Sequence, residues 1–136
     1  MISIINYRKI GIFVTMTAFF LSADAFAQEK NMEELHQEFE RNFQAMLKNP
    51  ADVDITMQYA KIAVSLGNYE AAIPPLERVL IFNPNLPKIK LELGVLYYKL
   101  DSMKMAKSYF KDAAADASAS DEIKASANEY LEKIKG

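Results

Sequence analysis

The chain has 136 residues, of which 51% are hydrophobic, and a formal net charge of −2 at pH 7. Because nucleic-acid binding depends on a broad basic surface, this mildly acidic composition predicts that no nucleic acid is among its partners. The absence of cysteine excludes disulfides and a lipidated N-terminal cysteine, so stability must come from the packing of the chain's own elements.

The N-terminal residues have the pattern of a secretory signal peptide over 1–27. Arg8 and Lys9 precede an uncharged apolar run over 10–21, and the sequence Ala-Phe-Ala over 25–27 predicts cleavage before Gln28. The apolar run is shorter than the roughly 20 residues that span a membrane. We therefore expect a periplasmic protein that does not span the membrane, with an uncleaved N-terminal anchor as the alternative.

Apolar residues recur at spacings of three and four through the rest of the chain, which is typical of amphipathic helices. The spacing predicts helices over 32–49, 53–66, 69–82, 88–100, 103–115 and 122–135. Pro74 and Pro75 lie inside the third of these, where two missing backbone donors predict a kink or a delayed helix start. No segment alternates with period two for long enough to form a strand, so the fold class is all-α.

A second pattern repeats after 34 residues and indicates stacked helix-turn-helix units. The small residues Ala60 and Gly94 are related in this way, and so are the larger Leu76 and Phe110. Small residues let paired helices approach closely, while large ones fill the space between units. The full set of related positions is Tyr59-Ala60, Ala72, Leu76, Val79 and Pro84, then Leu93-Gly94, Ala106, Phe110, Ala113 and Ser118.

Leu93-Gly94, Tyr97, Ala106 and Phe110 match the tetratricopeptide repeat pattern at its proper spacing, with Lys90 in place of the usual Trp. The chain therefore resembles the tetratricopeptide repeat (TPR) family. This resemblance implies an α-solenoid of two antiparallel helix-turn-helix repeats between two capping helices. The implied parts are an N-terminal capping helix or half repeat at 28–50, repeats at 51–86 and 87–118, and a C-terminal capping helix at 119–136.

A narrower similarity involves residues 76–87, LERVLIFNPNLP, and residues 91–98, LELGVLYY. These stretches resemble the N-terminal periplasmic repeat region of proteobacterial outer-membrane proteins related to the surface lipoprotein assembly modifiers. In those proteins a β-barrel follows the repeats, whereas this sequence stops at Gly136 and is expected to be a free-standing or shortened relative. The resemblance implies an outer-membrane or other envelope protein as a partner.

The sequence offers little for catalysis. The one histidine, His36, lies among acidic residues on the first predicted helix, where an exposed side chain is expected. His36 and Glu40 have the i, i+4 spacing of metal ligands, but they supply only two ligands. With no phosphate-binding loop and no nucleophile motif, we expect no catalytic residue, no metal and no cofactor, and hence no enzyme.

The resemblance also implies a binding face, because in related repeats the first helix of each pair lines the inner surface of the superhelix. Carried over by position, the predicted groove consists of Asp54, Met57, Lys61, Lys88, Leu91, Val95, Tyr98 and Lys99, with Val64, Glu122 and Glu129 extending it. Its apolar centre and lysine edges could seat a peptide or helix that bears acidic side chains. The alternative is that its apolar members contact the N-terminal capping helix.

We therefore expect an exported, non-enzymatic adaptor or scaffold that binds a protein or peptide partner. The alternative is a self-associating homo-oligomer, or a docking component of an outer-membrane assembly or export system. Two repeats are fewer than the roughly three usually needed for stability, so either the capping helices compensate or a second copy of the chain helps.

Overall fold

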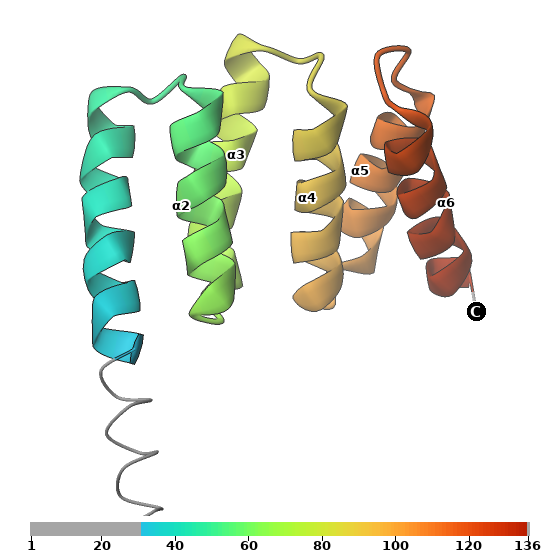
Figure 1. Cartoon of the computed structure of the whole chain (residues 1–136). Coiled ribbons are helices and arrows are strands. Elements are labelled where there is room, and N and C mark those ends of the chain that lie inside the picture. The colour runs from blue at the N-terminus through green and yellow to red at the C-terminus, as the bar shows by residue number, and fades with distance from the viewer. Residues whose placement is uncertain (1–30, 136) are drawn as a thin grey trace, which may run out of the picture. The chain divides into compact units, whose positions relative to one another are not determined.

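The computed structural model describes residues 31–135 (Figure 1). This part of the chain contains six helices and no strand. The first covers residues 31–48. The others are α2 (Val53–Ser65), α3 (Tyr69–Phe82), α4 (Pro87–Lys99), α5 (Met103–Ala115) and α6 (Asp121–Lys135). The all-α prediction is confirmed over this range, and the helices end within about one residue of their predicted bounds. The predicted signal peptide at 1–27 lies outside the described residues.

Within residues 31–135, no helix combines the length and hydropathy needed to cross a bilayer. The chain divides into two compact units between Gln37 and Glu38, inside the first helix. In the described part of the first unit, His36 is exposed, and its Nδ1 lies 2.8 Å from the carbonyl oxygen of Met32. The histidine therefore makes a local contact along its own helix, on an exposed surface as predicted.

In the second unit, helices pack in antiparallel pairs that are joined by equivalent turns. Gly67 closes the α2–α3 turn with a φ of +72°, and the next N–H, of Asn68, donates to the carbonyl of Ala63 at 2.9 Å. Exactly one repeat later, Asp101 has a φ of +58°, and the N–H of Ser102 donates to Tyr97 at 2.9 Å. Both turns thus end a helix with one left-handed residue, a conformation that glycine adopts without strain and aspartate adopts less readily.

Side-chain caps fix the start of three helices. At the start of α2, Asp52 accepts a hydrogen bond from the N–H of Ile55 at 3.0 Å. Asn68 accepts one from Ala71 at the start of α3, and Ser120 accepts one from Ile123 at the start of α6. Each cap satisfies a backbone donor that the first helical turn leaves without a partner.

The predicted delay of α3 by its two prolines is wrong. The helix begins at Tyr69 and includes both Pro74 and Pro75. The Asn68 cap establishes the first turn before the prolines are reached, and the fixed φ of proline is itself helical. Pro75 is buried among core residues while Pro74 is exposed, so the pair lies half inside the core and half on the surface.

The core contains two hydrophobic clusters. The first joins α2, α3 and α4 around the fully buried Leu76, Val79 and Leu93. The second joins α5 and α6 around Phe110 and Ala127, and its members pack against α4. Gly94 allows this packing, because a Cβ added there would lie 2.6 Å from two ring carbons of Phe110.

Three long-range polar contacts join the helices. Tyr97 and Tyr109 each donate a hydrogen bond of 2.9 Å to the same oxygen, Oε1 of Glu77, and their rings stack at 5.6 Å. Lys90, which replaces the usual Trp of the repeat pattern, instead makes an ion pair of 2.7 Å with Asp116. These contacts join α3 to both helices of the next pair, and the start of α4 to the segment that follows α5.

Candidate binding groove over α2, α4 and α6

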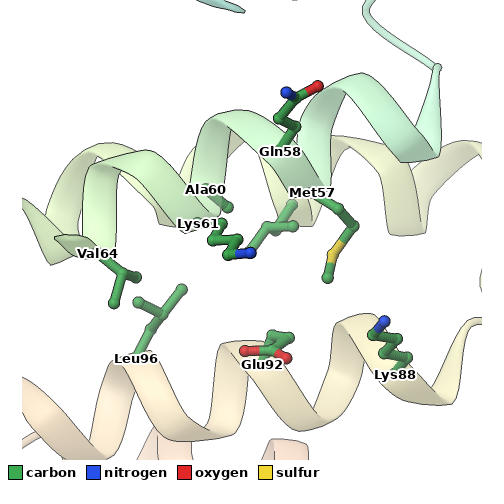
Figure 2. A pocket seen from close by; sticks show the side chains of 9 residues that line it. Met57, Gln58, Ala60, Lys61, Val64, Lys88, Glu92 and Leu96 are labelled. Carbon is green, nitrogen blue, oxygen red and sulfur yellow. The ribbon is translucent and has the colours of Figure 1, made fainter. Parts of the chain in front are cut away.

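A hollow of about 620 Å³ separates α2 from α4 and is the main candidate site. Figure 2 shows Met57 and Lys61 extending from α2, and Lys88, Glu92 and Leu96 extending from α4, into the same space. The buried Ala60, Leu76 and Leu96 provide an apolar floor. The complete lining is Met57, Gln58, Ala60, Lys61, Val64, Leu76, Lys88, Glu92 and Leu96. We call this space the α2–α4 hollow.

A second, smaller hollow of about 320 Å³ lies on the other side of the same α4 residues. Its lining is Lys88, Leu91, Glu92, Ser120, Glu122, Ile123 and Ser126, so we call it the α4–α6 hollow. Lys88 and Glu92 line both spaces. The two hollows lie on either side of Lys88 and Glu92, and we refer to them together as the groove over α2, α4 and α6.

The charged side chains of the groove do not form close ion pairs with one another. Lys61 and Lys88 are exposed, while Glu92 is half-buried. Burial raises the pKa of the Glu92 carboxyl above its usual value, and the positive charge of Lys88 offsets this only in part. Within the described range, no hydrogen bond and no ion pair within 4 Å involves Glu92. The carboxylate therefore has acceptor capacity that a ligand could use.

The structure brings together four of the eight residues of the predicted groove. Met57, Lys61 and Lys88 line the α2–α4 hollow, and Leu91 lines the α4–α6 hollow. Val64 and Glu122, which extended the prediction, also line the groove.

The other four predicted residues lie elsewhere. Val95 and Tyr98 are half-buried against the α5–α6 cluster, and the ring of Tyr98 meets that of Tyr130 edge to face at 5.4 Å. Asp54 and Lys99 are exposed and line neither hollow. The apolar end of the predicted strip thus packs on the C-terminal helices.

Sequence reasoning missed two polar residues of the α2–α4 hollow, Gln58 and Glu92. They are 34 residues apart and therefore occupy one repeat position. Glu92 also follows Lys88 by four residues, which places both on one helix face. The repeat register could have identified Gln58 and Glu92 together. Ala60 was interpreted as a packing residue only, although it also forms part of the floor of the hollow.

The groove has the chemistry of a binding surface. It offers an apolar floor, two ammonium groups, two carboxylates and two serine hydroxyls, and its lining has no histidine. Across residues 31–135, no three side chains of the types that ligate metals are close enough to hold an ion. What these groups can do together is hold an apolar side chain and orient the charges beside it.

Two comparisons with known proteins agree with this geometry. Residues 87–115, which correspond to α4 and α5, match the family model described as tetratricopeptide repeat. The fold is a tetratricopeptide-like helical repeat. The crystal structure of PcrH from Pseudomonas aeruginosa has a similar fold, with a TM-score of 0.59 and 20% sequence identity. That similarity covers 76% of this chain and 93% of PcrH. No curated protein sequence matches the chain.

The family match lies inside the second predicted repeat, 87–118, and the likeness to PcrH extends the shared fold beyond it. At 20% identity this likeness shows the fold alone. The predicted TPR-like architecture is therefore confirmed.

Proposed function

We propose that this protein is a non-enzymatic adaptor or scaffold that binds a polypeptide partner in the groove over α2, α4 and α6. The α2–α4 hollow supports the proposal most directly, because it combines an apolar floor with a charged rim. The tetratricopeptide match adds support, since repeats of this kind mainly offer extended binding surfaces.

We place this activity in the periplasm, with an outer-membrane or envelope protein as the partner. The signal pattern over 1–27 and the narrower sequence resemblance support this part of the proposal. N-terminal sequencing of the protein from a periplasmic fraction is expected to begin at Gln28. A protein that keeps Met1 and stays in the cytoplasm would exclude this location.

The groove proposal is tested by photo-crosslinking in cells. A photoreactive amino acid at position 64 is suitable, because Val64 lines the α2–α4 hollow and is 40% exposed. The control is position 104, since Lys104 is an exposed residue of α5 that lines neither hollow. We expect a discrete crosslink to another polypeptide from position 64 only. Identical products from both positions, or none from position 64, would contradict groove binding.

A second candidate function is self-association within a larger assembly. Ile81 and Phe82, at the end of α3, are 79% and 64% exposed, and Leu47 is 52% exposed at the position 34 residues before Ile81. Exposed apolar side chains at equivalent helix ends favour contact with a second copy of the chain. Sedimentation velocity over a wide concentration range tests this. We expect dimerisation that the double change Ile81→Ser and Phe82→Ser removes, and a monomer throughout would exclude it.

A further inference from the structure

The charged residues of the groove are separated by sign along its length. Lys61 of α2 lines only the α2–α4 hollow and Glu122 of α6 lines only the α4–α6 hollow, whereas Lys88 and Glu92 of α4 line both. Lys88 and Glu92 form the shared wall at which the sign changes. The groove is thus positive toward α2 and negative toward α6.

These groove charges differ from the other charged pairs of the fold. Lys90 pairs with Asp116 at 2.7 Å, and Glu129, which the sequence placed on the same face as Glu122, pairs with Lys133 at 2.7 Å. Among residues 31–135, by contrast, neither Lys61 nor Glu122 has an ion-pair partner within 4 Å. Charges that the fold leaves without internal partners are available to a ligand.

The middle of the groove selects for an apolar group. The floor formed by Ala60, Leu76 and Leu96 excludes a charged side chain, because burial without a partner would penalise it. Beside this floor, the half-buried carboxylate of Glu92 has no hydrogen-bond donor in the described part of the chain. A ligand N–H or a cationic side chain at this point would supply one.

Building on the proposed function, we infer that the groove binds its partner segment in one direction. The segment has acidic residues over α2, an apolar side chain in the α2–α4 hollow and a basic residue over α6. Packed helices lie about 8–10 Å apart. Because a hollow separates α2 from α4, crossing from α2 to α6 takes more than two such spacings, so the segment has at least about six extended residues at about 3.3 Å each. The partner is thus a short polypeptide stretch with a charge gradient.

Selection from a phage-displayed library of random 12-residue peptides, on the full chain immobilised by its C-terminus, tests this inference. We expect enriched peptides to contain acidic, apolar and basic residues in one constant order. The double change Lys61→Glu and Lys88→Glu should weaken a selected peptide by about 10-fold, as expected for reversing two partly exposed charges. The matched control, Lys104→Glu with Lys111→Glu on α5, makes the same change in net charge and should leave binding unaltered.

The outcomes separate the direction of binding from the proposed function. Val64→Asp places a charge in the α2–α4 hollow at an exposed position that the core does not need. In one outcome, peptides are enriched and Val64→Asp abolishes their binding, but the peptides show no charge order and the double variant binds them equally well. The directional inference is then wrong, while the groove proposal stands. If no peptide is enriched, or if Val64→Asp has no effect on binding, the groove proposal itself fails. Circular dichroism of each variant confirms that it is folded.

Discussion

Gly94→Ala is the substitution for which helix propensity and tertiary packing predict opposite results. Gly94 lies inside α4, where alanine is favoured over glycine by about 1 kcal/mol. A Cβ at this position, however, would lie 2.6 Å from Cδ1 and Cε1 of Phe110 and 3.1 Å from its Cγ. Favourable carbon contacts lie at about 3.5–4.0 Å, so the ring or the helix must move by about 1 Å.

The aromatic ring has little room for that movement. Phe110 is fully buried, and the ring of Tyr130 stacks on it at 4.7 Å and 8°. Overpacking of a well-packed core costs about 1–3 kcal/mol, and a ring confined in this way indicates a cost near about 3 kcal/mol. After subtraction of the propensity gain, we expect Gly94→Ala to lower the free energy of unfolding by about 2 kcal/mol. This corresponds to a fall in Tm of roughly 8–16 °C for a domain of this size.

Urea denaturation followed by circular dichroism at 222 nm measures this loss. The control is Phe110→Leu, which removes the ring atoms that the new methyl group would meet. The double variant is expected to be more stable than the sum of the two single changes predicts, because the overlap is absent. A stabilised Gly94→Ala variant, or strict additivity in the double-mutant cycle, would refute the packing argument.

Three further predictions use the same denaturation assay. The Lys90 ion pair and the Ser118 hydrogen bonds lower the pKa of Asp116 from 3.8 to about 2. The stability that this carboxylate contributes is therefore present above about pH 4 and is lost as the pH falls toward 2. Asp116→Asn should therefore reduce stability at pH 7 more than at pH 2.5, and an equal loss at both would contradict the shift. Glu77→Gln should lower the free energy of unfolding by about 1–3 kcal/mol, because two phenols lose their charged acceptor. In an absorbance titration at 295 nm, the pKa of Tyr97 in this variant should fall below its value of about 12. An unchanged titration would contradict this. Gly67→Ala meets no atom within 4 Å yet should cost about 1 kcal/mol, because the left-handed φ penalises alanine. No loss of stability would contradict that reason.

Local features could be predicted from the sequence because they depend on residues close together in the chain. Asn68 caps the helix that begins at Tyr69, and Gly67 ends the one before it, in both cases through neighbouring backbone groups. The 34-residue period reaches further, since it shows that the same pair of helices occurs again. These signals determined the helices, their antiparallel pairing and the repeat fold.

The groove could be predicted only in part, for a physical reason. The repeat register identifies which helices share a face, and three of the residues it selects, Met57, Lys61 and Lys88, line the α2–α4 hollow. The repeat register does not determine the distance between those helices. α4 packs against α6 and half-buries Tyr98, whereas α2 and α4 leave a hollow between them.

The contacts that position the groove also join residues far apart in the chain. Tyr97 and Tyr109 reach Glu77 across 20 and 32 residues, and Lys90 reaches Asp116 across 26. A contact of this kind forms only when packing has set the distance between the helices, which no local pattern encodes. The sequence by itself therefore determined the helices, their turns and the repeat that orders them. The tertiary structure alone decided which faces stay open and where Glu92 meets the groove.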